Sequence, residues 1–172
     1  MEPVIHEKAA DGEVYDTGSI RLRVLAQAPD HPIAITDNTV PPGFPGPVRH
    51  RHRMMTDIFY VLEGELAFEL AGDWYVLGPG AFVLVPPGLA HSFTNRGSVP
   101  ARILNIQQPS GLEQYLKEAV KRMTEGHPWS PEEMAEIAVQ YDFEPVPADG
   151  QVTARFRPRR EESVPAENAP KP

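Results

Sequence analysis

Residues 80–95 read GAFVLVPPGLAHSFTN, and the surrounding chain is best understood outward from them. Ala81–Val85 is apolar and rich in β-branched and aromatic residues, which favours a short buried strand. Pro86-Pro87-Gly88 ends that strand, because proline cannot donate to a sheet ladder and glycine suits a tight turn. The stretch therefore predicts a strand, a turn and a second strand that carries His91.

Short apolar runs separated by turns continue on both sides of this stretch. They lie at 20–24, 33–40, 58–62, 66–70, 74–77 and 101–107. Several alternate apolar with polar residues, as half-buried strands do. The chain has 20 prolines and 13 glycines, which punctuate short segments and argue against a long helical bundle. Many short strands at close spacing indicate an all-β sandwich or barrel.

The pattern changes at residue 110. Ser110–Glu113 and Ser130–Glu133 each have the form of a capping box, and apolar residues at helical spacing follow both, so two C-terminal helices are predicted. After Glu144 the chain is rich in proline and charge without periodicity, which favours disorder. The predicted organisation is an N-terminal extension over 1–18, a barrel over 19–109, helices over 110–143 and a disordered Pro-rich tail over 144–172.

Composition excludes several classes of protein. The 172 residues are 41% hydrophobic, enough for a packed core, and contain no cysteine, so disulfides, thiolate metal ligands and a cysteine nucleophile are excluded. The net charge of −8 argues against a nucleic-acid partner. No apolar run approaches the roughly 20 residues of a membrane span. The N-terminus lacks the features of a signal peptide, so we expect a cytoplasmic protein.

Three histidines form a pattern with one acidic residue. His50 and His52 share one face of a strand, because residues i and i+2 point to the same side. Asp57 follows on the next apolar strand, and His91 comes after the Pro-Pro-Gly turn, where an adjacent strand can bring it to the same place. Three neutral imidazoles and a carboxylate suit a divalent transition metal and leave coordination positions open. The alternative is an exposed basic patch over Arg49–Arg53. The remaining histidines, His6, His31 and His127, are expected at the surface.

The spacing resembles the two sequence motifs of the cupin superfamily. The first motif has the form G-x5-H-x-H-x3-4-E-x6-G, and the second has the form G-x5-P-x-G-x2-H-x3-N. Residues 49–64 resemble the first through His50, His52, Asp57 and Gly64. Residues 80–95 agree with every fixed position of the second, which are Gly80, Pro86, Gly88, His91 and Asn95.

Two positions depart from the first motif. Gly46 lies closer to His50 than the motif's glycine would, a difference that a loop tolerates. Asp57 stands where the family has glutamate and is one methylene shorter. It could ligate a metal after a small backbone shift, act through a water molecule, or leave a site of three histidines.

The resemblance implies a small barrel of two antiparallel sheets, the double-stranded β-helix or jelly roll, with a metal inside one open end. The two C-terminal helices and the segment Thr56–Gly64 resemble quercetin-dioxygenase-like bacterial cupins. In that reading His50, His52, Asp57 and His91 hold iron, manganese, nickel, copper or zinc, and Asp57 is also the catalytic base. The family also implies a homodimer. Outward apolar residues at Ile58, Tyr60 and Leu62, which need a cover, agree with this expectation.

Alternation places Phe59 and Val61 on the same interior face as Asp57, and Phe93 on that of His91. With Phe44 at the rim they predict an apolar substrate pocket, or else they fill the barrel core. We therefore expect a metal-dependent cupin enzyme, oxygenase-like, acting on a small apolar or aromatic molecule. The alternatives are a metal-dependent isomerase or cyclase of the polyketide-pathway type, and a non-catalytic small-molecule-binding cupin.

Overall fold

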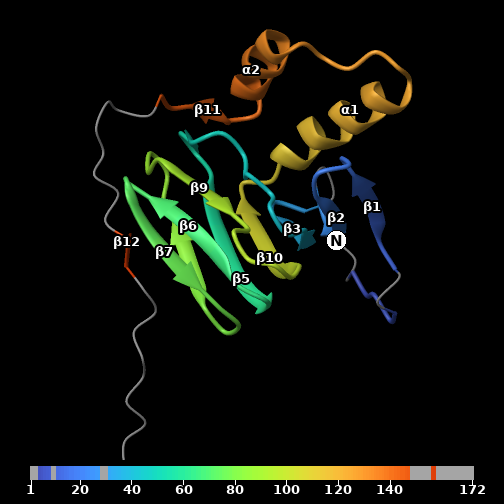
Figure 1. Ribbon diagram of the computed structural model, residues 1–172. Coiled ribbons are helices and arrows are strands. Elements are labelled where there is room, and N and C mark those ends of the chain that lie inside the picture. Colours follow the sequence, from blue (N-terminus) through green and yellow to red (C-terminus); the bar gives the residue numbers. More distant parts are fainter. Residues whose placement is uncertain (1–3, 9–10, 28–30, 148–155, 158–172) are drawn as a thin grey trace, which may run out of the picture.

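The strands form two six-stranded sheets that face each other (Figure 1). The computed structural model describes residues 4–8, 11–27, 31–147 and 156–157. Sheet A holds, in spatial order, β1 (Glu13–Asp16), β2 (Arg21–Ala26), β3 (Ala34–Val40), β10 (Ala101–Gln108), β5 (Thr56–Glu63) and β8 (Phe82–Val85). Sheet B holds β11 (Glu144–Pro145), β4 (His50–Arg51), β9 (His91–Thr94), β6 (Leu66–Leu70), β7 (Asp73–Leu77) and β12 (Phe156–Arg157). The predicted all-β double sheet is thus confirmed.

The strand registers set which side chains enter the space between the sheets. In sheet A, β10 lies antiparallel between β3 and β5, with Gln107 opposite Asp57 and Asn105 opposite Phe59. In sheet B, β9 lies between β6 and β4, and His50 is directly opposite His91. Since opposed residues share a face, both sheets present their site residues to the barrel interior.

The barrel core joins the two sheets. Buried apolar side chains from β3, β5, β6, β8, β9 and β10 form one cluster: Val40, Phe59, Val61, Leu66, Phe68, Val83, Val85, Phe93, Ala101 and Ile103. On β5, β8 and β10 buried residues alternate with less buried ones, so one face of each of these strands points into the core. The core fills the part of the barrel beyond the histidines, so these lie toward one end.

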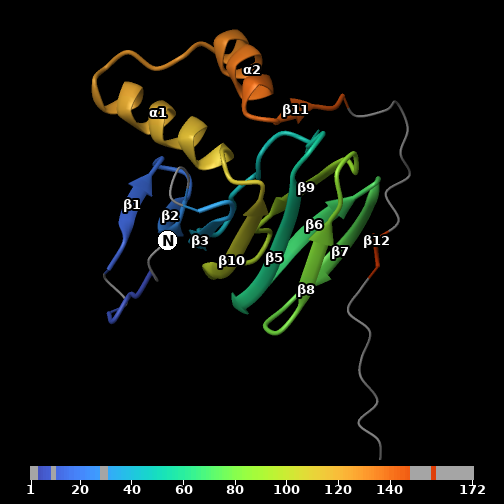
Figure 2. The same cartoon turned by 180° about the vertical axis from the view of Figure 1, so that it is seen from behind.

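Helix α2 (Pro131–Gln140) lies beside β11 and helix α1 (Leu112–Thr124) lies beside β1, both at that end of the sheets in the two views of the molecule (Figures 1 and 2). They form a second apolar cluster in which Met55, at the start of the β5 segment, packs with Leu112, Tyr115 and Ala138. The helices are therefore attached to the chain between His52 and Asp57. Neither is long and apolar enough to cross a membrane, and this holds for every helix among the described residues.

One of the two predicted capping boxes is wrong. Ser130 and Glu133 form the reciprocal box at the start of α2. At α1 the N-cap is Gly111, and no side chain caps it. Ser110 lies one residue before the N-cap, and its hydroxyl donates to the carbonyl oxygen of His31, 2.9 Å away.

Two short strands lie beyond residue 143. Glu144 and Pro145, placed by the sequence at the start of the disordered tail, pair with Arg51 and His50 as β11. Residues 156–157 pair in parallel with β7. The rest of the predicted tail, 148–155 and 158–172, lies outside the described residues. At the other end, β1 falls within the predicted extension 1–18 and pairs with β2.

Candidate metal centre

The four predicted ligands meet in the barrel interior. His50 lies on β4, His52 just after it, Asp57 on β5 and His91 on β9, and one ligand atom from each lies within 4.8 Å of the others. All four side chains are buried, with His52 and His91 no more than 2% exposed. The alternative of an exposed basic patch is therefore wrong for the histidines. The arginines between them point outward, as Arg51 and Arg53 contact Glu144 at the surface.

Each histidine is held by a backbone carbonyl at Nδ1. The acceptors are the oxygens of Val48 for His50 at 2.8 Å, Asp142 for His52 at 2.5 Å and Leu89 for His91 at 3.1 Å. Since a carbonyl can only accept, Nδ1 carries a proton in all three rings, and in the neutral form of each ring Nε2 keeps its lone pair. This is the second-shell arrangement that orients metal-binding imidazoles.

The inner face of the site contains polar atoms without partners. His52 Nε2 and His91 Nε2 are buried, and neither has a hydrogen-bond partner among the described residues. Asp57 Oδ2 is their nearest anionic atom, at 3.7 Å from His52 and 3.5 Å from His91. Ligand atoms about 2.0–2.2 Å from one tetrahedral ion would lie about 3.4 Å apart, so these spacings fit a shared ion. The residues could hold a metal.

Asp57 reaches the cluster although it is shorter than glutamate. Its Oδ2 faces the histidines, while Oδ1 accepts a short hydrogen bond from Asn105 Nδ2 on the neighbouring strand. Asn105 Nδ2 also donates to the carbonyl oxygen of Ile58 at 3.1 Å. Asn105 thus orients the carboxylate toward the histidines. Of the three alternatives for Asp57, this arrangement favours direct ligation of a metal.

The charges in the site suit a cation. Burial and the nearby His91 lower the pKa of His50 to about 3, so this ring is neutral. Burial alone would raise the pKa of Asp57, but the contacts with His52 and His91 outweigh it and lower that pKa to about 2. Burial would likewise lower the pKa of His52, but Asp57 and the Asp142 carbonyl outweigh it and raise the pKa. An ionised carboxylate thus faces imidazole nitrogens.

The predicted pocket residues lie in the barrel core. Phe93 is the centre of an aromatic group, with its ring centroid 5.9 Å from that of Phe44 and 5.7 Å from that of Phe59. Phe59 lies 6.4 Å from the His91 ring, and Val61 is fully buried. These contacts agree with the core-filling alternative, and a role as pocket walls stays a prediction.

Sequence reasoning missed three residues of the site. Asn105 could have been found, because it alternates with Ile103 and Gln107 on a predicted strand and so faces inward. Asp142 and Phe143 could not, because they follow α2 and contact the site only through folding. The Phe143 ring stacks on His50 with centroids 3.9 Å apart and an angle of 14° between the planes.

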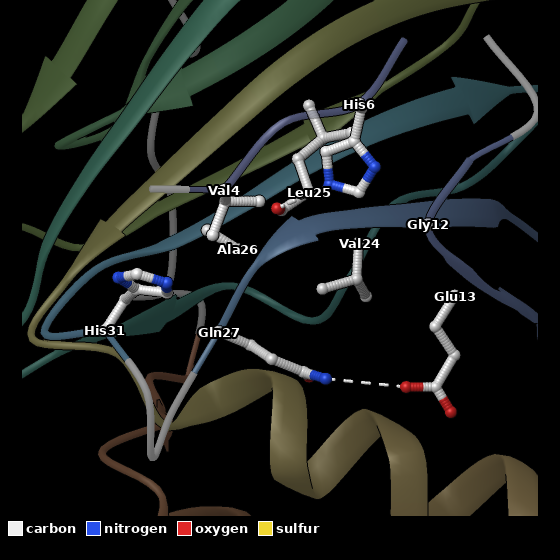
Figure 3. A pocket seen from close by; sticks show the side chains of 9 residues that line it. All are labelled: Val4, His6, Gly12, Glu13, Val24, Leu25, Ala26, Gln27 and His31. Carbon is white, nitrogen blue, oxygen red and sulfur yellow. Dashed lines mark hydrogen bonds between the residues drawn. The ribbon is translucent and has the colours of Figure 1, made fainter. Parts of the chain in front are cut away.

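A separate hollow of about 220 Å³ lies between the N-terminal segment and β2 (Figure 3). Its lining includes His6 and His31, which the sequence analysis left outside the metal pattern, and none of the four candidate ligands. His6 Nε2 lies 2.9 Å from the carbonyl oxygen of Leu25 and is thus engaged with the backbone.

Comparison with known proteins agrees with this fold. Residues 38–107 match the family described as "Cupin domain". This range holds every candidate ligand, and together with the architecture it supports the cupin superfamily and confirms the predicted cupin fold. An uncharacterized protein of Methanocaldococcus jannaschii is 32% identical over 60 residues, which are 35% of this chain and 48% of that protein. The match thus spans about half the length of this curated relative.

Two solved structures show the same architecture. An RmlC-like cupin from Shewanella frigidimarina has a TM-score of 0.53 and 24% identity, covering 60% of this chain and 89% of its own. The polyketide cyclase RemF from Streptomyces resistomycificus has a TM-score of 0.54 and 24% identity, covering 64% and 81%. At these identities the likeness concerns the fold.

Proposed function

We propose that this protein is a metal-dependent cupin enzyme, oxygenase-like, that acts on a small apolar or aromatic molecule. The observation that carries the proposal is the convergence of imidazole nitrogens on the Asp57 carboxylate, with Nε2 of His52 and His91 buried and without partners. Burying such groups without a partner costs free energy, which a bound ion would recover.

The residues of the chain have distinct roles in this proposal. When bound, a divalent metal would supply a Lewis acid, and a redox-active one such as iron, manganese or copper could also exchange electrons with dioxygen. His50, His52 and His91 would hold it. Asp57, which its lowered pKa keeps deprotonated, is the carboxylate of the cluster that would accept the proton of an enolic or phenolic substrate. Asn105 keeps that carboxylate aimed at the centre.

Polar side chains inside the barrel favour a second candidate, a metal-dependent isomerase or cyclase that needs no dioxygen. Gln107 lies opposite Asp57 in the sheet, and Thr36 lies opposite Asn105. Both are buried and on the interior face. Such a wall suits a substrate that carries several carbonyl or hydroxyl groups, of the kind a polyketide cyclase acts on.

Metal analysis of the purified protein tests both candidates. We expect one transition metal per chain, or stoichiometric loading with Mn²⁺, Fe²⁺, Ni²⁺, Cu²⁺ or Zn²⁺. His91→Ala should lose the metal, while His127→Ala, at an exposed histidine, should retain it. Asp57→Ala then separates a four-ligand site from a three-histidine site. A wild-type protein that cannot be loaded with any of these ions would refute both enzyme hypotheses and leave the small-molecule-binding alternative.

Oxygen consumption divides the two enzyme candidates. The loaded protein would be mixed with flavonols, catechols and diketones, and oxygen uptake and product formation followed together. Uptake that matches turnover supports the oxygenase, whereas turnover without uptake supports the isomerase or cyclase.

A further inference from the structure

The strand that carries the first histidine is weakly held by the barrel alone. β4 has two residues, and its pairing with β9 is the single pair His50–His91. Its other edge pairs with β11, and Val146 N–H donates to the carbonyl oxygen of Arg49 at 2.8 Å. Because a short strand with one partner is marginal, the position of His50 depends on a segment that begins after α2.

Asp142 connects this segment to the second histidine in two ways. Its carbonyl oxygen accepts from His52 Nδ1 at 2.5 Å. Its carboxylate accepts the backbone N–H groups of Arg53, Met54 and Met55 at 2.6, 2.9 and 2.8 Å. These three residues lead from His52 toward Asp57, so Asp142 holds both a ligand and the loop between two ligands.

The backbone of Asp142 makes this double contact possible. Its φ of 62° lies in the left-handed region, which aspartate, asparagine and glycine adopt more readily than other residues. The turn is anchored on its helical side by Phe143 N–H, which donates to the carbonyl oxygen of Ala138 at 3.0 Å. Beyond the turn, Glu144 contacts Arg51 at 2.9 Å and Arg53 at 2.8 Å.

Phe143 completes the contact on the ring of the first histidine. It stacks on His50 and lies edge-on to His52, with centroids 6.1 Å apart. The segment Tyr141–Pro147 is here called the C-terminal clasp. It lies outside the residues of the first motif and contacts both histidines of that motif.

We propose that Asp142 is a positioning residue of the metal centre, and that docking of the C-terminal clasp and metal binding are coupled. This inference rests on the proposed function, in that the four ligands hold an ion. An imidazole that is fixed at Nδ1 presents Nε2 in one direction, and such outer contacts typically contribute 10- to 100-fold to metal affinity. By reciprocity, a metal that favours the ordered ligands favours the docked clasp to the same extent.

The test measures Zn²⁺ affinity by competition with a chromophoric chelator. Asp142→Gly keeps the left-handed backbone accessible and removes the carboxylate, so the Kd for Zn²⁺ should rise about 10- to 100-fold. Asp142→Asn retains an acceptor oxygen, so its Kd for Zn²⁺ should lie between those of wild type and Asp142→Gly. Asp16→Gly is the matched control, because the Asp16 carboxylate also accepts a backbone N–H, from Gly18 at 2.9 Å, away from the site. An unchanged Kd in Asp142→Gly overturns the inference.

A second readout distinguishes positioning from a general loss of stability. At saturating Co²⁺ the visible spectrum should change in Asp142→Gly and stay that of wild type in Asp16→Gly, because only the first frees the backbone of residues 53–55, which joins His52 to Asp57. A Co²⁺ spectrum identical to that of wild type in Asp142→Gly would contradict the positioning role.

Hydrogen exchange tests the coupling in the wild-type chain, without any variant. Zn²⁺ should slow amide exchange in residues 141–147 more than in β10, and equal exchange with and without Zn²⁺ would overturn the coupling. The inference and the proposed function fail differently. Suppose that wild type binds Zn²⁺, that His91→Ala abolishes binding, that the Kd of Asp142→Gly is unchanged and that Zn²⁺ does not alter amide exchange in the clasp. The proposed metal centre then stands and only the inference fails. If wild type binds no metal, both fall.

Discussion

Asn105 illustrates how one amide controls the chemistry of a neighbouring carboxylate. It is buried on β10, and its Nδ2 donates to Asp57 Oδ1 and to the carbonyl oxygen of Ile58. The bond leaves Asp57 Oδ2 as the oxygen that faces the histidines. A carboxylate that is held in this way is positioned before any ion arrives.

We expect Asn105→Leu to weaken Zn²⁺ binding by about 10- to 100-fold, because Asp57 loses the donor that orients it. Asn38→Leu is the matched control, since Asn38 is also a buried amide but lies on β3, opposite Ile103. Chelator competition measures both. Equal affinities in the two variants would show that Asn105 does not orient the ligand.

Gly46, the glycine that fits the first motif poorly, has a steric role of its own. Its φ is 91°, and a Cβ built on it would lie 1.8 Å from the carbonyl oxygen of Phe93. The loop before β4 thus approaches β9 so closely that only glycine fits.

Gly46→Ala should lower the free energy of unfolding by about 2–5 kcal/mol, from backbone strain and the clash together. Gly43→Ala separates the two causes: Gly43 has a φ of 73° but open space around it, so only the strain of about 1–2 kcal/mol applies. Urea unfolding of both variants is the measurement. If both lose the same amount, the close approach contributes nothing.

At the scale of elements, a group of ion pairs around one aspartate joins three strands of sheet A. Asp37 on β3 is 6% exposed and contacts Arg23 on β2 at 2.6 Å. Arg102 on β10 binds it through two nitrogens, at 2.8 and 2.7 Å. The Arg102 hydrogen bonds, with help from Arg23, hold the pKa of Asp37 below its ordinary value despite burial.

The sign of the pH dependence follows from this shift. A carboxylate whose folded-state pKa is lowered stabilises the fold above its unfolded pKa of about 3.9, and this contribution is lost as the pH falls through the folded value. Asp37→Asn should therefore be less stable than wild type by about 1–3 kcal/mol at pH 7, with the difference shrinking below about pH 4. Urea unfolding from pH 7 to 3 checks this. Glu63→Gln, at an exposed partner of Arg102, should change stability by less than about 1 kcal/mol.

The elements themselves were largely predictable, and the errors have local causes. Strand 66–70 was predicted because its alternation reports which face is buried, and strand 58–62 because it is a short apolar run between turn signals. The box at Ser110 was wrong because the helix begins one residue later than the box requires, with Gly111 at the N-cap. β4 and β11, with two residues each, are too short to produce a period, so neither pairing could be read from the chain.

For the whole molecule, the part of the outer face of sheet A on β5 and β8 is apolar and exposed. Tyr60 lies opposite Phe82, and Ile58 lies opposite Leu84, with Tyr60, Phe82 and Leu84 exposed by 41%, 60% and 51%. The dimer that the sequence analysis expected remains a proposal, and this face is its interface in that proposal.

Leu84→Asp should convert the proposed dimer to monomer in sedimentation velocity, because it places a charge in the middle of the buried face. Val99→Asp is the control, since Val99 is 58% exposed and outside sheet A's strands. A wild-type protein that sediments only as a monomer at micromolar concentration would contradict the proposal.

The sequence by itself determined the barrel and the identity of the four candidate ligands. Strand alternation and the spacing of His50, His52, Asp57 and His91 are patterns along the chain. They can be recognised in the sequence because the direction of a side chain on a strand depends on its position relative to its near neighbours. Only the tertiary structure decided how these ligands are held. The contact from Asp142 to His52 spans 90 residues of chain, and no local pattern encodes it. It exists because α2 packs on Met55 and thereby brings a left-handed turn against the histidine loop.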